Sequence, residues 1–186
     1  VYRFFPKNVY FTLDDHKHRW IVRVWWHIVD AFSWHGADHV RTILHDEQPN
    51  VVITHNLKGI GLKIPSIIAD AGIPYIHVVH DLQLIVPSGL LMFGHEKEPW
   101  YVWPGRALYR VVCRSKFESP HAVIFPSQYL KDVYTSYRFF PKSTIVVLHN
   151  PTPDNHEPVS LTRVPGPLKL LFVGQLEYHK GILFLL

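Results

Sequence analysis

The segment Gly72-Ile-Pro-Tyr-Ile-His-Val-Val-His-Asp81 decides the fold class. A glycine and a proline lead into a short run of strand-forming residues, and a polar His-Asp pair follows at once. Three other runs share this character: Val51-Val-Ile-Thr54, Ala122-Val-Ile-Phe125 and Thr144-Ile-Val-Val-Leu148. Because they are nearly continuously apolar, they are typical of parallel strands buried on both faces.

Segments with helical spacing precede and separate these strands. They cover residues 21–32, 37–47, 60–71 and 104–117, and a further helix follows Ser127, which can cap it. Gly36 is expected to break the first helix and Gly72 to end the third. Alternating strands and helices predict an α/β fold, with a Rossmann-like parallel sheet covered by helices and right-handed crossovers.

The last part of the chain predicts a second domain. Residues 150–167 are rich in proline and are interpreted as an interdomain linker. A strand over 168–173 and a helix from Lys180 then indicate the start of another Rossmann-like domain, truncated at residue 186. Since the chain begins with Val1 and stops inside an apolar run, we expect a fragment whose first domain covers residues 1–149.

Composition excludes several classes of protein. Of the 186 residues, 47% are apolar and 18% charged, which rules out a disordered chain. The net charge of +4 is spread along the sequence without a basic block, so no nucleic-acid partner is expected. No run approaches the roughly 20 apolar residues of a membrane span. The single cysteine, Cys113, fits a reducing compartment and a cytoplasmic location.

Candidate site residues follow the predicted strands. In open parallel sheets, ligands bind beyond the carboxyl ends of the strands. These ends carry His55-Asn56, His80-Asp81, Ser127 and His149-Asn150. Dinucleotide, P-loop and hydrolase motifs are absent, and His35 and His39 flank Gly36 without a third ligand, so neither a cofactor nor a metal is expected.

The segment Phe172-Val-Gly-Gln-Leu-Glu-Tyr-His-Lys-Gly181 is the most specific signal. A strand would end at Gly174, and Lys180 would open a helix. A glycine turn, a helix N-terminus and a lysine together suit a diphosphate. The alternative interpretation is an ordinary strand-loop-helix unit with an exposed lysine.

The chain resembles glycosyltransferases of family 4, which have the GT-B fold of two facing Rossmann-like domains. The resemblance rests on residues 50–56, 72–81, 123–130 and 148–151, and on 172–176 with Lys180-Gly181. It implies transfer of a sugar from a nucleotide-diphosphate-sugar donor to a glycan, lipid or small-molecule acceptor, with retained configuration and without a metal. It also implies that Gly174 and Lys180 bind the diphosphate and that His80 faces the donor sugar. In the family, a first strand and its glycine-rich turn precede the segments matched here, so the resemblance implies that the domain over 1–149 lacks its first strand.

The resemblance leaves alternatives open. Gln175 stands where the family usually has an arginine, and it cannot form a charged bidentate clamp. A non-catalytic or epimerase-like GT-B relative therefore stays an alternative, as does a small-molecule-binding Rossmann-like module. Asp81 either orients His80 or caps the following loop. Because the family's paired glutamates should lie beyond residue 186, we expect this fragment alone to be inactive.

Two surfaces and one repeated segment complete the predictions. Arg106, Arg110 and Arg114 form a stripe opposite Ala107, Leu108, Val111 and Val112, which predicts a solvated basic face, with peripheral contact to anionic lipid as the alternative. The tryptophans of the helix over 21–32 are expected to be buried between two layers rather than to dip into a membrane. Tyr-Arg-Phe-Phe-Pro-Lys occurs at 2–7 and again at 137–142, as two loop segments without a regular repeat.

Overall fold

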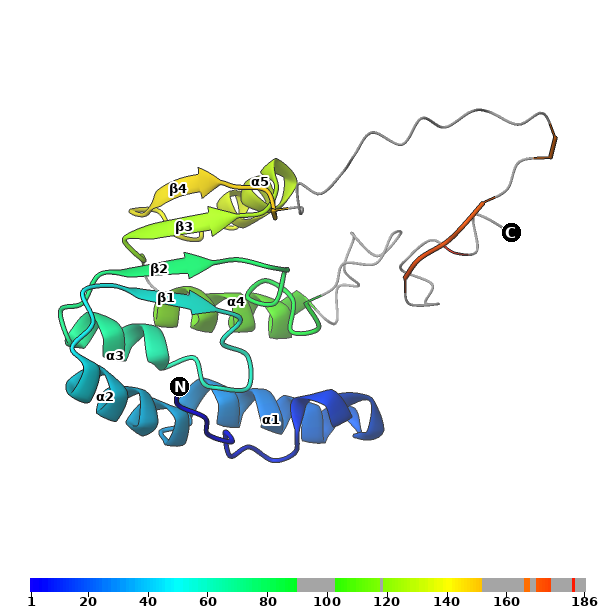
Figure 1. The fold of residues 1–186 in the computed structure, drawn as a ribbon. Coiled ribbons are helices and arrows are strands. Elements are labelled where there is room, and N and C mark those ends of the chain that lie inside the picture. Colours follow the sequence, from blue (N-terminus) through cyan, green and yellow to red (C-terminus); the bar gives the residue numbers. More distant parts are fainter. Residues whose placement is uncertain (90–102, 118, 152–165, 168–169, 175–181, 183–186) are drawn as a thin grey trace.

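The structure is a computed structural model that describes residues 1–89, 103–117, 119–151, 166–167, 170–174 and 182. Its centre is a four-stranded sheet in the order β1-β2-β3-β4, and all strand pairs are parallel (Figure 1). The strands are β1 (Val52–His55), β2 (Tyr75–Val78), β3 (Ala122–Phe125) and β4 (Thr144–Val147). The helices are η1 (Thr12–Lys17), α1 (Trp20–Phe32), α2 (His35–Glu47), α3 (Ile64–Asp70), α4 (Trp103–Phe117) and α5 (Gln128–Ser136). The predicted α/β, Rossmann-like class is confirmed.

One face of the sheet carries the core. Thr54 pairs in register with His77, and His77 with Val123, so these side chains point to the same face. Helices pack against that face: the Phe117 ring of α4 lies 4.9 Å from His77, and the Tyr134 ring of α5 lies 5.6 Å from Phe125. All six residues are buried.

The opposite face of the sheet differs from the prediction of burial on both sides. Among the described residues, Ile53 on β1 is 57% exposed and Val146 on β4 is 41% exposed, while Ile76 and Ile124 between them are half-buried. The apolar character of these strands therefore correctly indicated a parallel sheet. It did not indicate how much of each face these helices cover.

The two glycines act differently. Gly72 has φ +68° and ends α3, as predicted. Gly36 does not break a helix, because α1 ends before the extended Ser33 and Gly36 lies in the first turn of α2. A Cβ atom at Gly36 would lie 2.1 Å from the Ile60 carbonyl oxygen. The glycine is therefore required by the close approach of the loop after β1.

Helix α1 turns its main apolar face outward, which contradicts the predicted burial between two layers. Trp26 is 2% exposed and packs inward, where its Nε1 donates to the Tyr10 carbonyl at 2.9 Å. Trp25 is 57% exposed and Trp20 71% exposed. Because Trp26 and the buried Asp30 fill the inward side, the regular apolar stripe is left on the surface.

The arginine stripe of α4 was also predicted wrongly. Arg110 is buried, and its guanidinium lies 4.7 Å from the Tyr137 ring centroid. Arg114 donates to the Tyr137 carbonyl oxygen at 3.1 Å. Leu108 and Val111, expected inside, are exposed. Arg110 and Arg114 therefore pack beside the turn after α5, where an aromatic ring and a carbonyl oxygen contact their guanidinium groups.

The second domain stays a prediction, because only residues 166–167, 170–174 and 182 are described after residue 151. Described residues 170–173 form no strand, and Leu170, Leu171 and Val173 are exposed. A strand needs a neighbouring strand to pair its backbone groups, and among the described residues none pairs with this segment. In the described ranges, no helix has the length and apolar character needed to cross a membrane.

Candidate functional site at the carboxyl edge of the sheet

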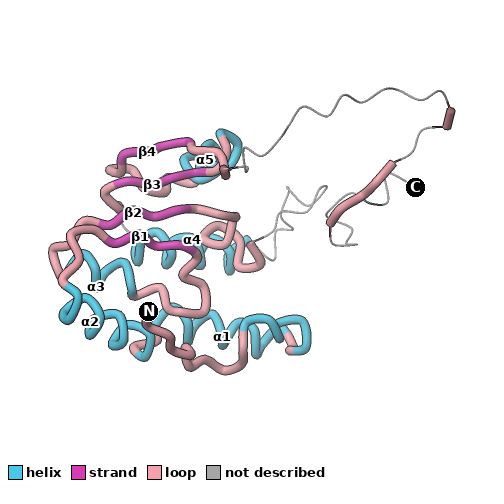
Figure 2. The backbone as a smooth tube through the Cα atoms, in the orientation of Figure 1, coloured by secondary structure: helices cyan, strands magenta, loops and turns pink. Residues whose placement is uncertain are grey.

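The four strands, magenta in Figure 2, end at the same edge of the sheet, because all run in one direction, as the arrows in Figure 1 show. His55 ends β1, and His80 follows β2 by two residues. Ser127 follows β3 by two residues, and Asn150 follows β4 by three. The prediction that chemistry-bearing residues gather along this edge therefore agrees with the topology.

His55 and His80 form the centre of the candidate site. His55 Nδ1 lies 2.8 Å from His80 Nε2, and the rings stack with their centroids 5.2 Å apart. At this distance one nitrogen carries the proton and the other accepts it. Both side chains are exposed, and the contact leaves His55 Nε2 and His80 Nδ1 to bond a ligand. Sequence reasoning placed both residues at the edge but did not foresee their direct bond.

A third histidine lies beneath this pair. His77 is 2% exposed, and its Nδ1 lies 2.9 Å from Thr54 Oγ1. Burial, together with the nearby His55 and His80, lowers the pKa of His77 to about 3. His77 is therefore neutral and supports the edge from inside. His77 lies inside β2, where successive side chains alternate between the two faces of the sheet. This alternation was the signal that sequence reasoning missed.

Asp81 caps the loop after β2. Its Oδ1 accepts from the Gln83 backbone N–H at 2.8 Å, and its carbonyl oxygen accepts from the Tyr134 hydroxyl at 2.9 Å. Its neighbour His80 bonds to His55 instead. Of the two predicted roles for Asp81, the structure therefore shows the loop cap.

The loops after β1 and β2 are tied together by a lysine that the sequence did not single out. Lys58 Nζ donates to the Pro87 carbonyl oxygen at 2.9 Å. Asn56 is exposed, and its Oδ1 accepts from the Lys58 backbone N–H at 3.3 Å. These contacts hold Asn56 in a turn beside His55.

The other end of the edge is less available for chemistry. Ser127 Oγ accepts from the Leu130 backbone N–H at 3.2 Å, so this residue caps α5 as predicted. His149 Nδ1 donates to the Pro126 carbonyl oxygen at 3.0 Å and thereby joins the ends of β3 and β4. Asn150 is exposed next to it. At this edge the His55–His80 pair is therefore available to a ligand, whereas Ser127 and His149 bond to backbone groups.

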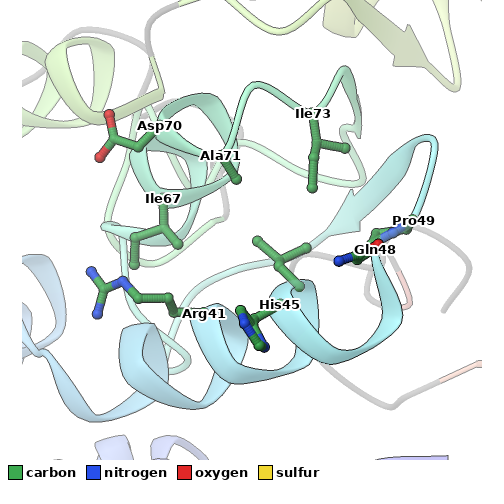
Figure 3. A pocket seen from close by; sticks show the side chains of 9 residues that line it. Arg41, His45, Gln48, Pro49, Ile67, Asp70, Ala71 and Ile73 are labelled. Atoms are coloured by element: carbon green, nitrogen blue, oxygen red, sulfur yellow. The ribbon is translucent and has the colours of Figure 1, made fainter.

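A hollow of about 500 Å³ lies at the opposite edge of the sheet (Figure 3). It is bounded by α2, by α3 and by the segments that lead into β1 and β2, where Pro49 and Ile73 lie. The apolar side chains of Leu44 and Ile67 are among those that line it. Because ligands of parallel sheets bind at the carboxyl ends of the strands, we place the candidate site at the histidines and not in this hollow.

The residues predicted to bind a diphosphate are not tested by the structure. Gln175 and Lys180 lie outside the described residues, and Gly174 is described without them. Within the described ranges, no cluster of three or more potential metal ligands occurs. The diphosphate-binding role of Gly174, Gln175 and Lys180 stays a prediction.

These features define an α/β protein with a Rossmann-like parallel sheet and a histidine-lined carboxyl edge. Its sequence matches Glycosyltransferase Family 4 over residues 8–156, and the chain belongs to this family. It is also 25% identical over 174 residues to an uncharacterized 42.6 kDa protein in the cps region of Klebsiella pneumoniae. That alignment covers 94% of this chain and 46% of the relative, so the chain spans about half the length of that protein.

Proposed function

We propose that these residues form the acceptor-side domain of a glycosyltransferase that moves a sugar from a nucleotide-diphosphate-sugar donor to an acceptor with retained configuration. Membership of family 4 supports the general activity. The observation that carries the finer proposal is the bond between His55 and His80 at the carboxyl edge. It gives His80 a fixed orientation toward the space beyond the strands, where a sugar ring would lie.

The residues have separate roles in this proposal. His80 contacts the donor sugar, and His55 positions it. Asp81 holds the loop that follows. Gly174, Gln175 and Lys180 bind the diphosphate at the start of a donor domain that begins at residue 168, joined through the linker 150–167. A fixed cation and backbone N–H groups stabilise the negative charge that develops on the departing nucleoside diphosphate.

The acceptor is a glycan, a lipid or a small molecule, and the pathway is glycan biosynthesis. The free, buried thiol of Cys113 accords with a reducing compartment such as the cytoplasm. Asn56, Ser127 and Asn150 lie along the edge from which an acceptor approaches. Peripheral contact with a membrane would accompany an acceptor that is carried on a lipid.

The test uses the full chain with all its flanking sequence. A calorimetric screen of nucleotide sugars identifies the donor, and NMR of the product's anomeric proton reports its configuration. We expect His80→Ala to lower kcat/KM by about 100-fold, because it removes a fixed polar contact to the reacting sugar. His121→Ala is the matched control, because His121 is an exposed histidine at the amino end of β3.

Each contrary result identifies one alternative. Equal activity of the His80→Ala and wild-type proteins would remove His80 from the site. Donor binding without transfer would support an epimerase-like or non-catalytic relative. A chain that binds no nucleotide sugar would support the small-molecule-binding module.

A further inference from the structure

The outward face of α1 is a continuous apolar surface. Its members recur at helical spacing and are 43–62% exposed: Ile21, Val24, Trp25, Ile28 and Phe32. The opposite side of the helix is held by the protein, since Asp30 Oδ1 accepts from the Gly59 N–H at 3.0 Å and the Asp30 carbonyl from the Leu62 N–H at 3.2 Å. The helix is therefore fixed with its apolar face to the outside. Its 13 residues extend over about 20 Å.

The charge around this face is positive. Asp30 is the only acidic residue between His16 and Ala37, and it is 3% exposed. At the start of α1, Arg19 is exposed, while Asp14 and Asp15 are engaged by Lys17 and Arg23. Because Asp30 is the only acidic residue of α1, the described helix itself places no carboxylate on its outward face.

The end of α1 carries two cations on aromatic rings. Lys63 Nζ lies 3.0 Å from the Trp34 ring centroid, and Lys116 Nζ lies 5.4 Å from that of Phe32. Desolvation and the charge of Lys116 lower the pKa of Lys63. Asp38 lies near enough to oppose this shift, but its carboxylate bonds to Arg41 at 2.7 Å. Two neighbouring lysines beside exposed aromatic rings favour an anionic surface.

We propose that this apolar face of α1, flanked by Arg19, Lys63 and Lys116, docks onto a bilayer surface that carries anionic headgroups. The helix lies in the plane of the interface. Its aliphatic side chains and Phe32 enter the acyl boundary, tryptophans occupy the headgroup level, and the lysines meet lipid phosphates. Apolar burial and charge attraction act together, which gives firmer attachment than either alone.

Docking through α1 would make the membrane contact of the proposed function, in place of the arginine stripe of α4 that the sequence offered as an alternative. It does not depend on sugar transfer, because vesicles bind without donor or acceptor. Donor binding measured by calorimetry tests the glycosyltransferase proposal separately. Failure of one experiment therefore leaves the other interpretable.

The first experiment is co-sedimentation of the full chain with two kinds of vesicle. One is phosphatidylcholine alone, and in the other phosphatidylglycerol replaces about a third of the lipid. We expect clear binding to the anionic vesicles, at least about ten-fold weaker binding of Trp25→Ser/Ile28→Ser, and a selective loss on anionic vesicles for Lys63→Glu/Lys116→Glu. Tyr129→Ser is the matched control, because Tyr129 is 65% exposed on α5.

A second experiment keeps the test decisive if a serine variant folds poorly. Ile28→Cys is labelled with an environment-sensitive dye, which reacts selectively because Cys113 is 0% exposed. The emission should shift to the blue when anionic vesicles are added. The same dye on Tyr129→Cys should not respond.

Several outcomes would overturn the proposal. They are vesicle binding unchanged by the α1 substitutions, no response of the dye at position 28, or a dye that is already in an apolar environment without lipid. The last result would mean that flanking sequence covers the face. A dimer that Trp25→Ser/Ile28→Ser dissociates would assign the face to a second copy of the chain.

Discussion

The hexapeptide Tyr-Arg-Phe-Phe-Pro-Lys occurs twice in this chain, and its two copies meet opposite fates. In residues 137–142 it forms the turn between α5 and β4, and both phenylalanines are 2% exposed. In residues 2–7 it lies along the surface without regular structure, and Phe5 is 87% exposed. The prediction of two loop segments is confirmed for both copies.

The difference shows how the context, and not the local sequence, decides burial. The second copy follows a helix whose end it completes: the Arg138 N–H donates to Thr135 at 2.9 Å and the Phe139 N–H to Tyr134 at 3.1 Å. This turn delivers Phe140 against Tyr134, with ring centroids 6.0 Å apart. The first copy has no such helix before it, and its Phe4 stacks on the exposed His39.

The largest expected effect comes from truncating equivalent phenylalanines. Phe140→Ala should lower the free energy of unfolding by about 3–5 kcal/mol, because it opens a cavity among buried aromatic rings. Phe5→Ala, the matched change in the other copy, should stay within about 0.5 kcal/mol. Urea unfolding followed by circular dichroism measures both. An equal loss in the two variants would show that the first copy is also buried in solution.

The second effect concerns the histidine that Phe140 helps to bury. The Phe140 ring lies 6.0 Å from His77, whose pKa is lowered to about 3. A histidine with a depressed pKa in the folded state contributes stability that is complete above its ordinary value near 6.5. That stability is lost as the pH falls toward 3. Between pH 7 and pH 5 we expect a loss of about 2 kcal/mol from this residue.

His77→Gln isolates this contribution because glutamine does not titrate. The measure is the difference between the wild-type and variant profiles of unfolding free energy against pH. The wild-type profile alone is not sufficient, since burial raises the pKa of Asp30 to about 6 and that group favours folding as the pH falls. Parallel profiles for the two proteins would contradict the buried, neutral state of His77.

The same lesson explains which parts of the molecule the sequence could predict. The strand over 122–125 was predicted with its observed bounds, because its β-branched and aromatic residues and its flanking breaks are local signals. The meeting of His55 and His80 at one edge was predictable, since parallel strands fix it. Their bond was not, because it depends on the paths of two loops.

Long-range contacts account for the other failures. The periodicity of α1 indicated an amphipathic helix, but Asp30 and Trp26 determine which side faces inward. The spacing of Arg106, Arg110 and Arg114 indicated a solvated stripe, but Tyr137, which is distant in sequence, contacts two of its members, Arg110 and Arg114. Gly36 was read as a local break, although its role is set by Ile60 on another loop. In each case the missing information was the identity of the neighbour.

The smallest expected effect, and the only stabilising one, comes from placing a glycine where the turn has a left-handed backbone conformation. Arg138 has φ +59°, in the left-handed region that favours glycine and that commonly follows the end of a helix. Arg138→Gly should raise the unfolding free energy by up to about 1 kcal/mol, because relief of this strain exceeds the added flexibility of the unfolded chain. Arg3→Gly should give no gain, since only flexibility is added there. Thermal unfolding of the two variants measures the change in stability, which should be positive for Arg138→Gly and zero or negative for Arg3→Gly. A rise in stability in both variants, or in neither, would show that the left-handed conformation does not distinguish the two copies.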